Sequence, residues 1–95
     1  MHFEVEGKII AALPPVTGVT KVGKDWEKLD FVLETSERYP KNIRFSMFSF
    51  DGPVEGAPCI GDDVRVRFII EARKSNDNWY NDVKAYQVES LKKQQ

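Results

Sequence analysis

The sequence predicts an all-β protein in which five strands form one small barrel. Apolar and polar residues alternate in several runs along the chain, and a period of two is typical of strands with one buried face. Residues 62–73 and 79–90 form two such runs, and the turn-forming residues K-S-N-D-N between them predict a β-hairpin. Residues 51–61 contain three glycines and two prolines, a composition that excludes a helix. The 95 residues make one domain with a modest core.

The N-terminal half contains the first three predicted strands. In the first, Gly7 predicts a bend or bulge where the strand turns a barrel corner, and Pro14 ends the run because proline donates no backbone hydrogen bond. In the second, Leu29, Phe31 and Leu33 share the inward face. The predicted segments are strand 3–13, loop 16–25, strand 26–35, turn 36–41 and strand 42–50.

The C-terminal half contains the fourth and fifth strands, which the hairpin joins. Val64 and Val66 begin the face directed into the core, while the arginines between and after them point outward. The alternation slips near Ala85–Tyr86, which predicts a β-bulge. The folded domain is therefore assigned to residues 1–90, and the polar residues 91–95 are expected to fray.

Five short strands in a chain of this length favour closure, because a closed barrel has no exposed strand edges. The small barrel whose middle strands present an outer binding face is the OB-fold. The predicted architecture is therefore a five-stranded OB-fold barrel without a helix between strands three and four. A β-sandwich and an SH3-like barrel remain alternatives, since composition does not separate them.

Composition and charge narrow the function. The net charge of −1 and the pI near 5.8 argue against binding of duplex DNA through overall charge, but they permit a local basic stripe. The single cysteine excludes an internal disulfide and suits a reducing cytoplasm, which is the expected location. No apolar run is long enough to span a membrane, and no secretory leader is visible.

The motifs give little support to catalysis or to a cofactor. Gly18–Lys24 matches a phosphate-binding loop, but Asp25 replaces the Ser or Thr that would bind magnesium, and strand alternation follows instead of a helix. His2 and Cys59 are single residues without a metal-ligand cluster. Asp62–Asp63 precedes a strand and suits a turn better than acid–base chemistry. We therefore expect a protein that is not an enzyme and holds no cofactor or metal.

Aromatic and basic residues on the outer faces of strands form the remaining pattern. Rings that stack on bases and cations that follow the backbone are how proteins bind single-stranded nucleic acid. The opposing interpretation places Phe48, Tyr80 or Tyr86 in the core and pairs Arg65 with Glu71 or Asp82. The candidate binding residues are Lys24, Trp26, Lys28, Arg44, Phe48, Arg65, Arg67, Arg73, Trp79, Tyr80 and Lys84.

The order of several segments resembles a family of small uncharacterised bacterial proteins. These segments include G-K-I-I-A-A-L-P-P (Gly7–Pro15), G-K-D-W-E-K-L-D-F-V-L-E-T (Gly23–Thr35), Y-P-K-N-I-R-F (Tyr39–Phe45), G-D-D-V-R-V-R-F-I-I-E-A-R and N-W-Y-N-D-V-K-A-Y-Q-V-E. The resemblance implies an OB-fold similar to bacterial single-stranded DNA-binding protein and to primosomal replication protein N. We expect the protein to be closer to the second, because segment 51–61 is helix-free and residues 91–95 do not resemble the long, acidic-tipped tail of the first.

The sequence thus predicts binding of single-stranded DNA, or RNA, without strong sequence preference and with a replication role. A homo-oligomer, with a dimer favoured, is expected because one OB domain covers only roughly 4–16 nucleotides. A protein–protein adaptor built on the same barrel is the main alternative, and the acidic pI favours it. A barrel that binds a sugar or another small ligand is a third.

Overall fold

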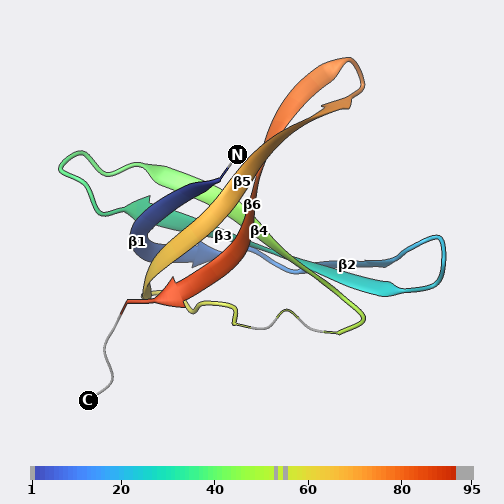
Figure 1. Ribbon diagram of the computed structural model, residues 1–95, viewed down its shortest axis with the longest axis horizontal. Helices are drawn as coiled ribbons and strands as arrows, with labels where there is room; N and C mark the ends of the chain where they lie inside the picture. The colour runs from blue at the N-terminus through green and yellow to red at the C-terminus, as the bar shows by residue number, and fades with distance from the viewer. Residues whose placement is uncertain (1, 53, 55, 92–95) are drawn as a thin grey trace.

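The computed structural model describes residues 2–52, 54 and 56–91, and all regular elements among them are β-strands (Figure 1). These residues contain no helix, and hence none long and apolar enough to cross a membrane. The strands are β1 (Phe3–Ala12), β2 (Val16–Val19), β3 (Asp25–Thr35), β4 (Asn42–Phe50), β5 (Asp63–Ser75) and β6 (Asn78–Ser90).

The sheet closes into a ring of five strands. Its order is β1-β5-β6-β4-β3-β2, and an additional β1–β3 pairing joins the two ends of the five-stranded part. Most neighbours are antiparallel, whereas β4 and β6 meet in parallel at a single register position, Ser46 opposite Lys84. The predicted five-stranded ring is confirmed, as is the absence of a helix between β4 and β5 within the described residues.

The prediction of a loop over residues 16–25 is wrong in its first part. Val16–Val19 forms β2, which pairs with the start of β3 outside the ring. Gly18 lowers the strand signal of this segment, but it lies opposite Trp26, and a Cβ there would come within 2.6 Å of the Trp26 ring. The glycine therefore leaves room for the Trp26 ring beside β2.

Two register shifts interrupt the ring: the one in β6 lies where the sequence predicted it, and the one in β1 lies two residues after the predicted position, Gly7. Gly7 pairs with β3 and β5 at once, and a Cβ at this position would collide with the carbonyl oxygen of Glu34. The register of β1 also shifts between Ile9 and Ala11. In β6, Arg67 and Phe68 pair with Gln87 and Ala85, which leaves Tyr86 as the extra residue of the predicted bulge.

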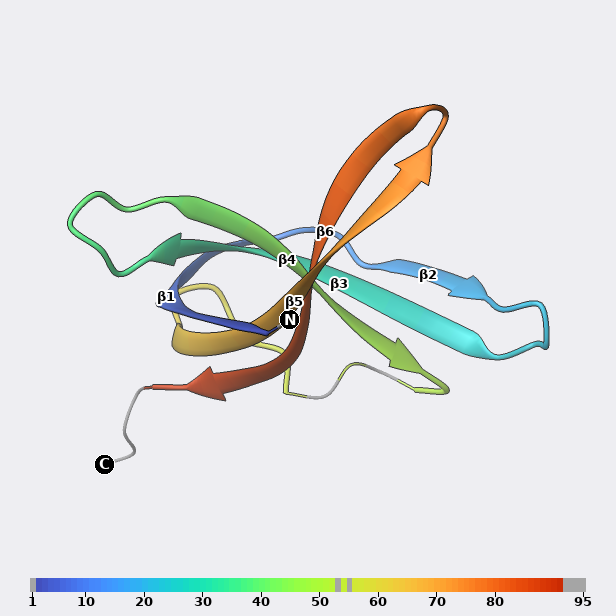
Figure 2. The same cartoon turned by 45° about the horizontal axis from the view of Figure 1, so that its top comes forward.

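The core lies inside the ring and is built from the predicted inward faces. Ile9, Leu33 and Val66 are fully buried, and the rings of Phe31 and Phe45 pack with their centroids 5.6 Å apart. The distal part of the β5–β6 hairpin projects away from the ring (Figures 1 and 2). Along the inward face of β5, Phe68 is therefore buried, Ile70 is half-buried and Ala72 is exposed.

The boundary between the domain and the tail is described only in part. The backbone N–H of Leu91 donates to the carbonyl oxygen of Asp63 at 2.9 Å, so the chain is still attached to the sheet one residue beyond β6. The other residues of the predicted frayed tail, 92–95, lie outside the described residues.

Candidate nucleic-acid interface

The outer face of β3 and β4 forms one wall of a groove. Residues directly opposite in an antiparallel pair share a face, so the register of these two strands determines which side chains are neighbours. The cross-strand pairs on this face are Trp26 with Phe50, Lys28 with Phe48, Asp30 with Ser46 and Val32 with Arg44. Aromatic rings therefore gather toward one end of the face and polar side chains toward the other.

The β5–β6 hairpin forms the opposite wall. Two adjoining clefts, of about 300 and 330 Å³, separate it from β3 and β4, and we refer to them together as the groove. The first wall contributes Trp26, Lys28, Asp30, Arg44, Ser46 and Phe48. The hairpin contributes Arg73, Tyr80, Asp82 and Lys84. Four cations and two carboxylates thus line the groove, which gives it an excess of positive charge.

Asp30 is a buried carboxylate at the polar end of the groove. It accepts a hydrogen bond of 2.6 Å from Ser46 Oγ and another of 2.6 Å from Arg44 Nη2, and Lys28 Nζ lies 3.9 Å away. Burial by itself raises the pKa of Asp30, but the hydrogen bonds from Ser46 and Arg44 and the charges of Lys28 and Arg44 together outweigh it and lower the pKa. Asp30 is therefore ionised at neutral pH.

Phe48 lines the cleft of about 330 Å³ and has a cation from each neighbouring strand close to its ring. The ammonium groups of Lys28 and Lys84 lie 5.8 and 5.9 Å from the centre of its ring, within the range of a cation–π interaction. The exposed fraction of Phe48 is 43%. An exposed ring between two cations has the chemistry that stacks on a base and contacts the adjoining phosphates.

The hairpin wall pairs its own cations with acids. Arg73 lies over the Tyr80 ring at 5.3 Å and forms an ion pair of 2.8 Å with Asp82. Lys84 forms an ion pair of 2.8 Å with Glu71. The exposed fractions of these side chains range from 27% to 62%, so solvent screens the ion pairs, which contribute little stability and can exchange for other anions.

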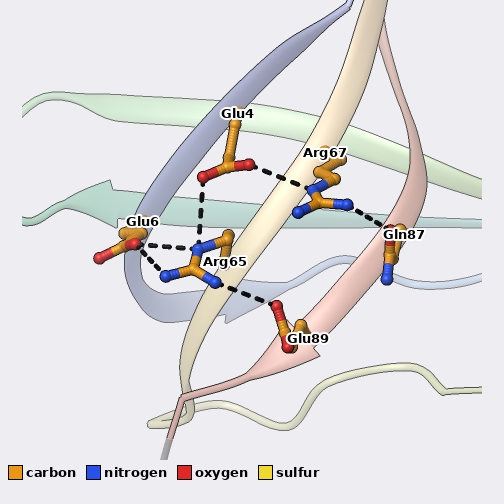
Figure 3. Close-up of polar contacts among 6 residues, drawn as sticks. All are labelled: Glu4, Glu6, Arg65, Arg67, Gln87 and Glu89. Carbon is orange, nitrogen blue, oxygen red and sulfur yellow. Dashed lines mark hydrogen bonds and ion pairs between the residues drawn. The ribbon is translucent and has the colours of Figure 1, made fainter.

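Arg65 and Arg67 lie on a different surface, the outer face of β1, β5 and β6 (Figure 3). Arg65 contacts Glu4 at 3.3 Å, Glu6 at 2.8 Å and Glu89 at 3.2 Å, and Arg67 contacts Glu4 at 3.1 Å. These ion pairs raise the pKa of Arg65, with the hydrogen bond to Glu6 as the largest cause. Together with Gln87, which accepts a hydrogen bond from Arg67, these residues form what we call the Arg65 network.

The remaining two candidate residues lie beyond the groove. Lys24 follows the turn after β2 and lies 3.8 Å from Asp51. Trp79 is near the tip of the hairpin, opposite Lys74, and its exposed fraction is 69%. The structure thus brings seven of the eleven predicted residues together in the groove and places Lys24, Arg65, Arg67 and Trp79 elsewhere.

The core alternatives weighed for the rings are settled by their exposure. Phe48, Tyr80 and Tyr86 are exposed, so none of them belongs to the core. The suggested pairing of Arg65 with Glu71 or Asp82 is also wrong, because those acids pair with Lys84 and Arg73.

Sequence reasoning missed three residues of this face: Asp30, Ser46 and Phe50. The alternation of β3 and β4 already placed them on the same side as Trp26 and Phe48, which was the available signal. The burial of Asp30 had no such signal, because it depends on the packing of Arg44 and Ser46 around the carboxylate. Within the described residues, no group of His, Cys, Asp or Glu side chains could hold a metal ion.

A model of the protein family described as Domain of unknown function (DUF3127) matches residues 4–89. The chain belongs to this family. A comparison of the DUF3127 chain with curated protein sequences finds no match.

Solved structures similar to this DUF3127 chain include two PriB (primosomal replication protein N) structures. The dimeric structure of the N-terminal domain of PriB from Thermoanaerobacter tencongensis has a TM-score of 0.58 and 15% identity over 97% of each chain. PriB from Ralstonia solanacearum has a TM-score of 0.53 and 6% identity over 96% of this chain and 97% of that chain. A small single-stranded DNA-binding protein from Streptomyces coelicolor has a TM-score of 0.45 and 13% identity over 95% and 93% of the two chains.

At these identities the likeness to PriB concerns the fold. The five-stranded ring, its order and its helix-free β4–β5 connection agree with the OB-fold that the sequence predicted. The predicted all-β OB-fold class is confirmed.

Proposed function

We propose that this DUF3127 protein binds single-stranded nucleic acid, DNA in the first place, along the groove. The observation that carries the proposal is the gathering of three rings and four cations on facing walls of one cleft. In the proposed complex, bases stack on Trp26, Phe48 and Tyr80. Phosphates meet Lys28, Arg73 and Lys84, while Arg44, the fourth cation, lies at the polar end of the groove.

The residues outside the groove have different places in this proposal. Lys24 and Trp79 extend the track, because one lies in the β2–β3 hairpin and the other near the tip of the β5–β6 hairpin. Arg65 and Arg67 are left outside the track, because glutamates already surround them on another face. Stacking and backbone contacts require no defined base, so binding is largely tolerant of sequence.

A fluorescence titration tests this function with the two native tryptophans as reporters. We expect oligothymidylate to quench the emission at low salt, and the quenching to weaken at physiological salt because bound phosphates release counterions. Trp79→Phe leaves Trp26 as the single tryptophan, so quenching that persists in this variant assigns contact to the groove. A flat response of the parent protein at low salt would reject nucleic-acid binding.

A homodimer completes the proposal. One OB domain engages roughly 4–16 nucleotides, so two linked grooves would raise the affinity for a longer strand. The solved PriB domain with the same fold is dimeric, which supports this assembly. Sedimentation of the full chain at high concentration would contradict it by giving a monomer.

A protein–protein adaptor is the second candidate, and the ion pairs favour it. Among the described residues, each of the seven lysines and arginines in the list of candidate binding residues has an acidic partner within 4.0 Å. An adaptor surface needs no free cations. The flat fluorescence response that rejects nucleic-acid binding is the result expected of an adaptor.

The proposed setting is the cytoplasm, where Cys59, which is free and exposed, would remain reduced. There the protein would act as a binding protein on single strands exposed during replication, with no reaction of its own.

A further inference from the structure

The polar end of the groove contains Arg44, which is held by Asp30 but is still exposed to a ligand. Arg44 Nη2 donates to Asp30 Oδ2 at 2.6 Å, while the Arg44 side chain remains 65% exposed. A guanidinium has five N–H donors, and this bond uses one of them. Ser46 holds the other oxygen of Asp30 at 2.6 Å, so the carboxylate that anchors Arg44 is itself fixed.

The anchor limits what the exposed part of Arg44 can bind. A phosphate would approach Arg44 beside the ionised carboxylate of Asp30, which already offsets part of the positive charge of Arg44, and the two negative groups would repel each other. A neutral base edge meets no such repulsion. Arg44 is therefore better suited to bind the edge of a base than a phosphate of the nucleic acid, in contrast to Lys84 at the other end of the groove.

The fork of a guanidinium distinguishes guanine from thymine and adenine. Guanine presents two adjacent acceptors, O6 and N7, which match two parallel N–H donors. Adenine places an amino donor beside N7, and thymine separates its two carbonyl acceptors by an N–H donor, so neither base offers an adjacent pair of acceptors. Tyr80, in the wall of the same cleft of about 300 Å³, is placed to stack on the base.

We propose that Arg44, positioned by Asp30, reads guanine in single-stranded DNA and adds a guanine preference to an otherwise sequence-tolerant groove. Asp30 acts here as a positioning residue, because it touches Arg44 and Ser46 and not the base. This inference rests on the proposed function and sharpens it.

Dissociation constants for matched oligonucleotides of about 12 nucleotides test the inference. One oligonucleotide is all thymine, and the other carries guanine at every third position so that no guanine runs form. We expect the full-length parent protein to bind the guanine-containing strand about tenfold more tightly than the thymine strand. Replacement of each guanine with 7-deazaguanine, which lacks the N7 acceptor but keeps the ring and its stacking, should remove most of this preference.

Arg44→Lys keeps the charge and removes the fork. It should bring the guanine-to-thymine ratio to within about twofold while leaving the affinity for the thymine strand nearly unchanged. Arg38→Lys, in the turn between β3 and β4 and stacked on Tyr39, is the matched control and should keep the parent ratio. Asp30→Asn should lower the ratio as well without weakening binding of the thymine strand, which a purely structural role would not do.

The possible failures are distinguishable. If the parent protein binds neither strand, the proposed function is rejected. If it binds both strands equally, or if Arg44→Lys or the 7-deazaguanine strand leaves the preference intact, the guanine reading is overturned and the groove remains a sequence-tolerant site.

Discussion

The groove and the Arg65 network contain similar side chains on the outer faces of strands, yet their surroundings differ. Arg65 lies between Glu6 on β1 and Glu89 on β6 in the sheet register, so acids flank it on both sides. Lys28, in the groove, lies across from Phe48 instead. Cross-strand neighbours therefore decide whether a strand's cations are available to a ligand or are occupied by the protein itself.

The charge balance extends this contrast. The two arginines of the Arg65 network pair with three glutamates, whereas the four cations that line the groove pair with three acids, Asp30, Asp82 and Glu71. The network therefore carries an excess of negative charge and the groove an excess of positive charge. A polyanion would be steered toward the groove and away from the network.

The largest expected effect is on stability, because the carboxylate of Asp30 in the groove is buried and those of the Arg65 network are exposed. Asp30→Ala should lower the free energy of unfolding by about 1.5–3 kcal/mol, because it removes hydrogen bonds from Ser46 and Arg44 to a buried charge. Urea denaturation at neutral pH measures this change. The counterpart Glu4→Ala, at an exposed carboxylate, should change it much less, and equal losses would erase the distinction between the two regions.

Asp30 also makes the stability of the protein depend on pH in the acid range. Because the pKa of Asp30 is lower in the folded state, its contribution is present above the ordinary value of 3.8 and is lost as the pH falls through the folded-state pKa. The stability of the parent should thus decrease more steeply in acid than that of Asp30→Asn. Parallel acid denaturation curves for the two proteins would contradict the assigned pKa direction.

Removal of an aromatic ring should weaken nucleic-acid binding in the groove but not elsewhere on the surface. Phe48→Ala should weaken binding of oligothymidylate by about 1–3 kcal/mol if one base stacks on the ring. Tyr39→Ala removes a ring that is 70% exposed in the β3–β4 turn and should leave the affinity unchanged. Fluorescence anisotropy of a labelled oligonucleotide measures both, and equal effects would remove Phe48 from the site.

Salt dependence compares the cations of the two regions directly. Lys84→Ala should reduce the slope of log K against log salt by about 0.7, the value for one lost phosphate contact on a single strand. Arg67→Ala should leave the slope unchanged, because Arg67 is held by Glu4 and Gln87 on another face. A smaller slope for Arg67→Ala would instead bring the outer face of β5 into the binding track.

The smallest effect is expected within the Arg65 network. Arg65→Gln removes ion pairs to three glutamates, but these pairs are solvent-exposed, so the melting temperature should decrease slightly at low salt. The difference should vanish at high salt, where exposed charges are screened. Thermal denaturation at two ionic strengths measures it, and a large, salt-independent decrease would show that Arg65 has a packing role.

Several features of the fold followed from the order of residues alone. Strict alternation identified Leu33 and Val66 as buried, and the slip in alternation located the bulge at Tyr86. Segment β2 was missed because Gly18 weakens its strand signal, and the compensating contact comes from Trp26, which is distant in sequence. Local propensity carries no information about such a contact.

The sequence by itself determined the all-β class, the inward faces of the strands and the residues that point outward, because a period of two assigns each side chain to a face. Tertiary structure decided which outward cations share a surface. Arg65 and Glu6 are 59 positions apart and meet only because β1 pairs with β5 in one register. Asp30 is likewise buried because the pairing of β3 with β4 packs Arg44 and Ser46 around its carboxylate. Pairing across strands is a property of the closed sheet, so the division between the groove and the Arg65 network arises only on folding.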